Sequence, residues 1–296
     1  MSKWLVTGAG GNLGHDLADA LSAEAGIELM AMSRAELDIT SAAAVSEAVA
    51  GHDVVVNAAA WTDVDGAEAD EAGALAVNGT GAAHIAAACA ESGAVLVHVS
   101  TDYVFAGDAT EPYREDAPIQ PLNAYGRTKA VGEAAVRDLL PERGFVVRTA
   151  WLYGEHGRNF VATILRASAE RETLDVVNDA AGQPTWSYPL AQRLVRLGRA
   201  AAAGQAPPGI YHGTASGCTT WYGLAREIFA LSGLDPDRVR PVTSDHIRRP
   251  ARRPSYSVLS QAGWARAGLA PLADWREMLA EALGRPAFAA LQGGSR

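Results

Sequence analysis

Short apolar segments alternate with stretches of helical spacing along the first half of the chain. The apolar segments lie at residues 4–7, 27–32, 53–60, 95–99 and 145–149. Helical spacing follows them, as with Leu13, Leu17 and Leu21 after the first segment. The third segment is almost continuously apolar, which is typical of a strand buried on both faces of a parallel sheet. Five such units predict an α/β fold with a Rossmann-type, doubly wound parallel sheet.

Shorter elements separated by loops make up the second half. The pattern predicts strands at 174–177, 209–212 and 239–242, and helices at about 159–171, 189–203, 220–231 and 274–283, with a frayed tail after the last helix. The sequence shows no repeat and no long linker. We therefore expect a sheet domain over residues 1–152 and a small α/β cap mainly over 153–296, with some segments returning to the sheet domain.

A glycine-rich turn joins the first predicted strand to the first helix. Gly8, Gly11 and Gly14 form a G-x-x-G-x-x-G pattern that begins directly after the strand, with Gly10 inside it. Glycines at these positions permit a tight turn, a close approach to a pyrophosphate and close packing of helix on strand. The helix N-terminus then faces the anion. The turn predicts a dinucleotide site.

The end of the second predicted strand bears on the choice of nicotinamide. An acid at this point suits a free ribose 2′-hydroxyl, whereas this chain has Ser33 and Arg34. An arginine suits a 2′-phosphate, so we expect NADPH rather than NADH. The alternative is that Arg34 is a solvated loop charge. Asp38 could accept a hydrogen bond from the adenine amine.

Small and polar residues follow the third and fourth predicted strands. Ala58, Ala59 and Ala60 would let a flat ring or a ribose approach, or they simply pack tightly. The fourth strand ends in Ser100-Thr101-Asp102. Ligands of open α/β sheets bind beyond the carboxyl ends of the strands, where all these residues lie. Asn78 interrupts an apolar helix over about 72–92, and a core role and a site role are both open for it.

Tyr125 and Lys129 are separated by four positions at the start of a predicted helix. Residues at this spacing share one helix face. A lysine charge beside a phenol lowers the pKa of the phenol and makes it a usable proton donor or acceptor. With a hydroxyl at the end of the fourth strand, the pair would move a proton on or off an alcohol or ketone oxygen. The alternative is a surface helix that carries both residues by chance.

Composition and charge narrow the classes of partner. The chain has 296 residues, 48% hydrophobic, and a net charge of −9, which disfavours a nucleic-acid partner. The two cysteines, Cys89 and Cys218, have no metal-ligand spacing and fit a reducing compartment. No apolar run is long enough to span a bilayer, and no signal peptide precedes the first strand, so we expect a cytoplasmic protein. The basic cluster at 248–254 could pair with a phosphate or remain solvated.

Together these motifs resemble the extended short-chain dehydrogenase/reductase superfamily. The glycine turn, residues 57–60, residues 100–105 and residues 125–129 carry the resemblance, which extends over nearly the whole chain. The residues of these motifs are most similar to those of reductases of dTDP-linked 4-keto sugars. The resemblance implies an NADPH-dependent reductase, with NADH possible, that acts on a dTDP-sugar and gives dTDP-L-rhamnose. The cap would bind the substrate.

The resemblance also implies roles for individual residues. Thr101, rather than Ser100, would hold the substrate oxygen, Tyr125 would donate the proton, and Lys129 would bind the nicotinamide ribose. The residues expected to line the cofactor are Gly8, Gly10, Gly11, Asn12, Leu13, Gly14, Ser33, Arg34, Asp38, Ile39, Ala58, Ala59, Ala60, Tyr125 and Lys129. Those expected to contact the substrate are Thr101, Asp102, Trp151, Asn159 and Arg253.

Several alternatives remain open at this point. The resemblance to these reductases leaves a metal open, because some members of that family hold magnesium between subunits with carboxylates. Position 15 is His15 here and no acidic cluster is evident, so no metal is expected. The chain would be a monomer or a homodimer. It could be a 4-ketoreductase for a different deoxysugar, with other stereochemistry at C4. It could also be a non-catalytic regulatory subunit that retains nucleotide binding.

Overall fold

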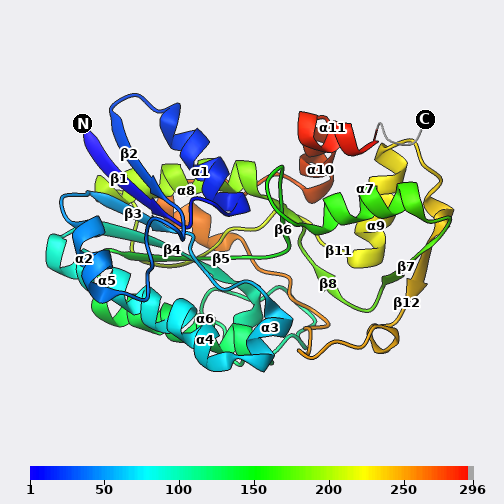
Figure 1. Cartoon of the computed structure of the whole chain (residues 1–296), viewed down its shortest axis with the longest axis horizontal. Coiled ribbons are helices and arrows are strands. Elements are labelled where there is room, and N and C mark those ends of the chain that lie inside the picture. The colour runs from blue at the N-terminus through cyan, green and yellow to red at the C-terminus, as the bar shows by residue number, and fades with distance from the viewer. Residues whose placement is uncertain (293–296) are drawn as a thin grey trace.

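A parallel sheet forms the centre of the computed structural model, which describes residues 1–292 (Figure 1). Within these residues the sheet has six strands in the order β10-β5-β4-β3-β1-β2, and every neighbouring pair is parallel. The strands are β1 (Ser2–Thr7), β2 (Ile27–Met32), β3 (Val54–Asn57), β4 (Val95–Thr101), β5 (Gly144–Thr149) and β10 (Gly209–His212). The predicted α/β fold with a doubly wound parallel sheet is confirmed.

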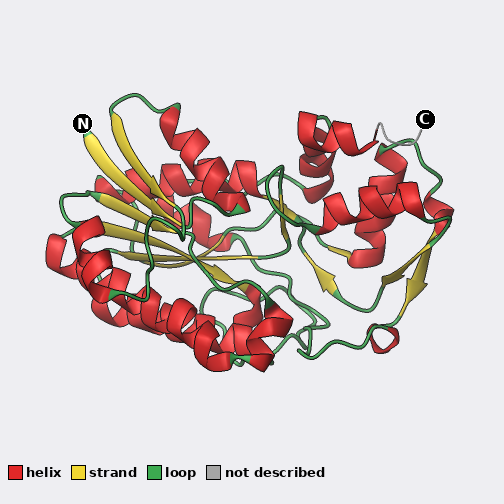
Figure 2. Ribbon diagram, viewed as in Figure 1, coloured by secondary structure: helices red, strands yellow, loops and turns green. Residues whose placement is uncertain are grey.

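Helices cover both faces of this sheet (Figure 2). One face packs against α1 (Asn12–Ser22) and α8 (Ser187–Ala202), and the other against α2 (Ala42–Val49), α5 (Ala82–Ser92) and α6 (Ala124–Leu139). Successive strand residues point to opposite faces. Val54 and Val56 therefore enter the core on one side and Val55 the core on the other. Burial on both sides explains the continuous apolar runs of the sequence.

The chain between β3 and β4 is helical but not regular. It contains α3 (Val64–Ala69), α4 (Glu71–Leu75), the π-helical turn η1 (Ala76–Gly81) and then α5. The single helix predicted over about 72–92 is thus three successive segments. π-helical turns are rare and often accompany functional sites, and Asn78 lies in this one.

The cap is built from short strands and helices of the second half. Its strand pairs are β7 (Leu174–Val177) with β12 (Val239–Val242), β8 (Ala181–Gly182) with β11 (Thr219–Thr220), and β6 (Leu152–Tyr153) with β9 (Thr185–Trp186). Its helices are α7 (Phe160–Glu170), α9 (Trp221–Leu231), α10 (Trp275–Leu283) and α11 (Pro286–Gln292). The 3-10 segments of the second half are η3 (Pro236–Arg238), η4 (Ser244–His246) and η5 (Ala262–Ala267), and a further one, η2 (Asp102–Val104), directly follows β4.

Two features of the second half refine the sequence prediction. Helix α8 and strand β10 return to the central sheet, so the sixth strand of that sheet comes from residues 209–212. The expected fraying after residue 283 is wrong for residues 286–292, which form α11 with Phe288 buried. The remaining tail, 293–296, lies outside the described residues. No helix within residues 1–292 is long and apolar enough to cross a membrane.

Candidate active site

The glycine turn after β1 is held by close backbone contacts. Gly8 has a φ of +75°, and a Cβ there would lie 2.5 Å from the backbone nitrogen of Ala59. A Cβ on Gly14 would collide with the carbonyl of Gly8. At Gly10 the nearest atom to such a Cβ is 3.6 Å away, so this glycine leaves an open side on the turn. Gly8 and Gly14 are therefore required for close packing. Gly10 and Gly11 lie at the surface and leave the N-terminus of α1 open, where an anion would bind.

The next two predicted cofactor residues behave differently from each other. Asn12 accepts a hydrogen bond from the backbone of His156 over 3.2 Å, so it joins the glycine turn to the loop after β6. Leu13 is 6% exposed and packs in the core, so only its backbone faces the turn.

An acidic residue, Glu36, lies just after β2 and was not among the residues predicted to bind the cofactor. Glu36 accepts hydrogen bonds from the backbone and the hydroxyl of Ser33 over 2.8 and 2.7 Å. These bonds lower the pKa of Glu36. Arg34 is exposed beside this turn. Further on, the side chain of Asp38 accepts from the backbone and hydroxyl of Thr40, while Ile39 is buried against Gly81.

Thr101 and Asp102 lie at the carboxyl end of β4, both buried. The Thr101 hydroxyl donates to Asp102 Oδ1 over 3.0 Å and accepts from the backbone of Tyr103 over 3.1 Å. Burial raises the pKa of Asp102 to about 7, although the nearby Ser257 and Thr101 hydroxyls oppose the rise. Asp102 therefore titrates near neutral pH.

This raised pKa gives a pH prediction. The ordinary pKa is 3.8 and the folded value about 7, so the folded protein binds the extra proton between these values. The free energy of unfolding then falls as pH rises through that window, by up to about 1.4 kcal/mol per pH unit from this residue. We expect Asp102→Asn to remove that component. Urea unfolding from pH 4 to 8 measures it, and identical slopes in variant and parent would refute the assignment.

Tyr125 lies at the start of α6, close to Thr101. Asn123 caps this helix by accepting from the backbone of Gly126 over 2.9 Å. Burial raises the pKa of Tyr125 to about 12, and the Thr101 hydroxyl partly opposes the rise. The expectation that Lys129 lowers this pKa is therefore wrong for the protein by itself. Lys129 directs its ammonium at a backbone carbonyl instead, so burial dominates.

Lys129 is almost completely buried, with 1% of its surface exposed. Its Nζ donates to the carbonyl of Val99 over 2.6 Å and lies 3.5 Å from His98 Nε2. Burial lowers the pKa of Lys129 to about 8, against an opposing effect of Glu133. Helix α6 thus holds the predicted phenol and amine beside the carboxyl end of β4.

The structure gives Asn78 a connecting role. Its Oδ1 accepts from the backbone of Trp61 over 2.8 Å, and its Nδ2 donates to the Trp61 carbonyl and to Thr128 Oγ1, each over 3.1 Å. Asn78 therefore ties the loop that follows Ala58–Ala60 to the helix that carries Tyr125. The core role left open by the sequence is confirmed, and a role for Asn78 in building the site stays a prediction.

Three predicted substrate residues already have partners. Trp151, the non-glycine residue with positive φ (+45°) in residues 1–292, stacks on Trp221 with ring centroids 3.6 Å apart. The Asn159 side chain caps α7 and donates to the carbonyl of Gly154 over 2.8 Å. Arg253 forms a bidentate ion pair with Asp65 at 2.9 and 2.8 Å. Their predicted contacts with substrate remain predictions.

A buried ion pair lies behind the site. Arg148 on β5 and Glu133 on α6 pair over 2.7 Å, and each side chain is 1% exposed. Arg148 Nη1 also donates to the carbonyl of Glu115 over 3.3 Å and lies 3.5 Å from His212 Nε2. Burial and this arginine lower the pKa of His212 to about 3, so its ring is neutral.

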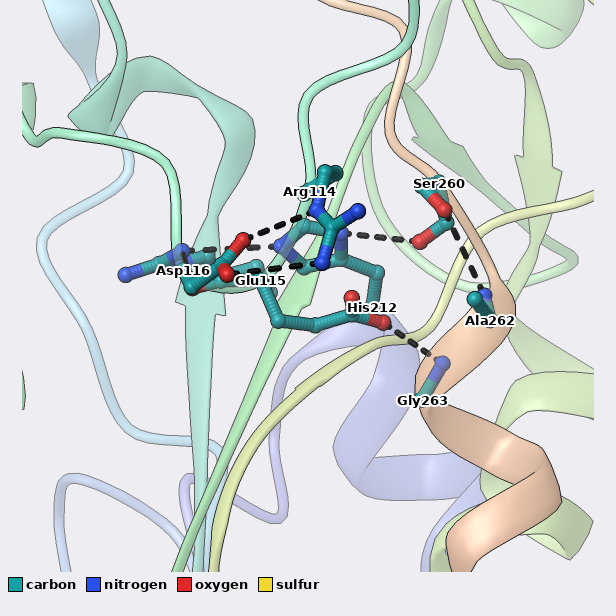
Figure 3. Close-up of polar contacts among 8 residues, drawn as sticks. Arg114, Glu115, Asp116, His212, Ser260, Ala262 and Gly263 are labelled. Atoms are coloured by element: carbon teal, nitrogen blue, oxygen red, sulfur yellow. Dashed lines mark hydrogen bonds and ion pairs between the residues drawn. The ribbon is translucent and has the colours of Figure 1, made fainter.

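These groups also fasten the loop between β4 and α6 to the C-terminal segment (Figure 3). The Glu115 carboxylate accepts from the backbone of Gly263 over 2.8 Å, and His212 Nδ1 lies 2.9 Å from the carbonyl of Ser260. Arg114 and Asp116 pair at the exposed edge of the same loop. The loop between β4 and α6 is therefore anchored at Glu115.

Nearly the whole chain matches one known protein family. The chain matches the family model described as the RmlD substrate binding domain over residues 2–287. The protein belongs to this family. The RmlD family match spans both the sheet and the cap, so the two parts are covered by one model.

Individual relatives of this chain support the same grouping. It is 56% identical over 281 residues to dTDP-4-dehydrorhamnose reductase of Streptomyces griseus, covering 94% of this chain and 92% of that protein. It is 50% identical to dTDP-4-keto-6-deoxy-D-glucose reductase of Streptomyces niveus, covering 95% and 96%. A crystal structure of the Bacillus anthracis dTDP-4-dehydrorhamnose reductase in complex with NADP is 34% identical, covers 96% and 99%, and has a TM-score of 0.88.

Sequence reasoning missed one group of this RmlD-family site. Thr7, Asn57 and His98 lie side by side in the register of β1, β3 and β4, next to Lys129. Only the strand register brings them together. The one signal in the sequence was that each is a polar residue in or at the end of an otherwise apolar strand.

No group of three His, Cys, Asp or Glu side chains that could hold a metal occurs in residues 1–292.

Proposed function

We propose that the protein reduces the 4-keto group of dTDP-4-dehydrorhamnose to give dTDP-L-rhamnose, with NADPH as the reductant. The observation that carries this proposal is the placement of Thr101, Tyr125 and Lys129 together beside a dinucleotide-type glycine turn. Family membership and the 56% identity to a reductase of that name support the choice of substrate. The NADP complex of a 34% identical relative supports the choice of cofactor.

The residues present fit the cofactor. The N-terminus of α1, left open by Gly10 and Gly11, would hold the pyrophosphate, the small residues Ala58–Ala60 would lie against the ribose or ring, and Lys129 would bind the nicotinamide ribose. When bound, NADPH supplies the hydride for the sugar carbonyl.

The chain's own residues handle the substrate oxygen. The Thr101 hydroxyl would hold the oxygen as negative charge develops on it. Tyr125 would donate the proton. Because burial raises its pKa to about 12, the phenol is protonated at neutral pH, which is the form that a reduction requires. With its pKa lowered to about 8, Lys129 is still mostly protonated near pH 7 and would bring positive charge toward the phenolate that remains.

The sugar nucleotide would lie between the sheet and the cap. Asp102 and the stacked Trp151 are near the sugar position in this proposal, and the exposed Arg248, Arg249 and Arg252 are available to the diphosphate. Arg253 would act through its ion pair with Asp65, which fixes the basic loop against α3.

Cofactor preference is tested at the end of β2. We expect Arg34→Ala to reduce the preference for NADPH over NADH about tenfold or more, because a charge-assisted bond to the 2′-phosphate is lost. Arg143→Ala, at the opposite end of the sheet, is the matched control and should leave the ratio unchanged. Steady-state kinetics with both nicotinamides measure the ratio. An unaltered ratio in Arg34→Ala would remove this residue from cofactor selection.

A second candidate reaction has its own support. The 50% identity to a dTDP-4-keto-6-deoxy-D-glucose reductase favours a related 4-ketoreductase that differs in substrate and in stereochemistry at C4. Incubation of the protein with NADPH and each dTDP-4-keto sugar, followed by NMR of the product, separates the two. No consumption of NADPH with either sugar would favour a non-catalytic nucleotide-binding subunit and would overturn the proposal.

We also propose that the enzyme works in the cytoplasm as a monomer or homodimer. Cell fractionation and light scattering on the purified protein test the two statements.

A further inference from the structure

A row of buried polar side chains crosses three strands next to Lys129. Thr7, Asn57 and His98 are neighbours in the strand register, and each is 1% exposed. Thr7 Oγ1 donates to Asn57 Oδ1 over 2.7 Å, and Asn57 Nδ2 lies 3.0 Å from His98 Nδ1. His98 Nε2 lies 3.5 Å from Lys129 Nζ. We call Thr7, Asn57 and His98 the sheet row.

The direction of these hydrogen bonds fixes the proton on His98. The backbone N–H of Ala59 donates to Asn57 Oδ1 over 3.1 Å, and a backbone N–H cannot accept. The other end of the Asn57 amide is therefore its NH₂ group, which donates to His98 Nδ1. Since Nδ1 accepts, the neutral ring carries its proton on Nε2. Burial and nearby Lys129 hold the pKa of His98 well below its ordinary value, so the ring is neutral.

This tautomer has a consequence for Lys129. An ammonium group has three donors and no acceptor, so only the neutral amine can accept from the Nε2–H of His98. The amine still donates to Val99 on β4. The other titratable groups near it are Tyr125 and Glu133 on α6, and Glu133 is paired with Arg148 of β5. The hydrogen bond aimed from His98 and the burial of Lys129 thus both favour loss of a proton from its ammonium.

We propose that the sheet row is a positioning device that aims a donor at Lys129 and thereby makes its ammonium easier to deprotonate. Its bearing on catalysis rests on the proposed function, in which Lys129 binds the cofactor ribose. A neutral amine can accept a hydrogen bond or a proton from its neighbours, whereas an ammonium can only donate. The row lies one layer behind the proposed catalytic residues and acts only through Lys129.

Histidine ring nitrogens report the tautomer directly. In ¹⁵N-histidine-labelled protein without ligands, we expect His98 to carry its proton on Nε2, with its signals assigned by their loss in His98→Asn. Asn57→Asp should move the proton to Nδ1, because a carboxylate only accepts. Thr7→Val is the matched control and should leave the tautomer unchanged, since Ala59 still orients the amide. A wild-type proton on Nδ1 would overturn the proposal without any variant.

Lysine NMR tests the effect on the amine. The chain has two lysines, Lys3 and Lys129, so ¹³C-lysine labelling gives a separate titration for each. Lys3 is half-exposed and serves as the internal reference. We expect Lys129 to titrate at about pH 8. In Asn57→Leu we expect this titration to shift upward by about one pH unit or more, because His98 is then free to offer Nε2 as an acceptor. An upward shift in Asn57→Asp but none in Asn57→Leu would show a charge effect alone and refute the tautomer mechanism.

These measurements separate the two proposals. The NMR readouts need neither cofactor nor turnover, so they judge the sheet row even if the protein consumes no NADPH. Absence of turnover with any dTDP-4-keto sugar would instead refute the proposed function and leave the lysine and histidine results standing.

Discussion

Tyr125→Phe is expected to lower turnover by roughly 10²- to 10⁴-fold, the range typical of a lost general acid. The substitution removes only the phenol oxygen, and the ring stays in place against Tyr103, whose centroid is 5.7 Å away. The proton for the sugar oxygen then has to come from water. Steady-state NADPH oxidation with dTDP-4-dehydrorhamnose measures the loss, and fluorescence titration should show NADPH affinity within a few fold of the parent.

The neighbouring phenol supplies a matched control. Tyr103→Phe deletes the same atom from a ring in contact with Tyr125, so it tests whether any phenol loss in this place disturbs the site. We expect it to retain most of the activity. Near-normal turnover in Tyr125→Phe, or equal losses in the two variants, would remove Tyr125 from its role as proton donor.

Glu133→Gln is expected to lower the free energy of unfolding by about 3–5 kcal/mol. The change leaves the Arg148 guanidinium buried without its counter-charge, which is the costly way to break a buried pair. The hydrogen bond from Arg148 to the backbone carbonyl of Glu115 and its contact with His212 offer no negative side chain in exchange. Urea unfolding followed by circular dichroism measures the difference.

Two further variants show whether the cost of Glu133→Gln comes from burial of the unpaired Arg148 charge. Arg127→Gln, on the same helix, breaks a bidentate pair with Glu71 whose side chains are 44% and 47% exposed, and should cost only about 0–1 kcal/mol. A double change of Glu133→Leu with Arg148→Met removes both buried charges and should cost less than Glu133→Gln alone. Equal costs for the buried and the exposed pair would contradict this account.

The sequence could predict features that depend on local pattern. The apolar runs identified the five strands of the first half, and the glycines after β1 placed the turn because a Cβ at Gly8 or Gly14 has no room. Thr101, Tyr125 and Lys129 could be grouped because the carboxyl ends of parallel strands meet at one edge. That rule needs only strand order and direction.

Features that depend on long-range register or competition between partners could not be predicted. Asn57 and His98 meet because residue 57 on β3 is opposite residue 98 on β4, which no local pattern states. The pKa of Tyr125 depends on how deeply α6 is buried, and spacing alone suggested the opposite direction. Arg253 looked free for a phosphate because its partner, Asp65, is 188 positions away along the chain.

The return of β10 and α8 to the central sheet has a consequence for recombining this protein with its relatives. A fragment ending at residue 152 would lack an edge strand and the helix that covers Trp4 and Val54 through Gly198. Such a fragment would expose core surface and should not fold independently. Chimeras that exchange substrate preference should therefore keep residues 187–212 with the parent that supplies the sheet, and take only the flanking segments from the donor.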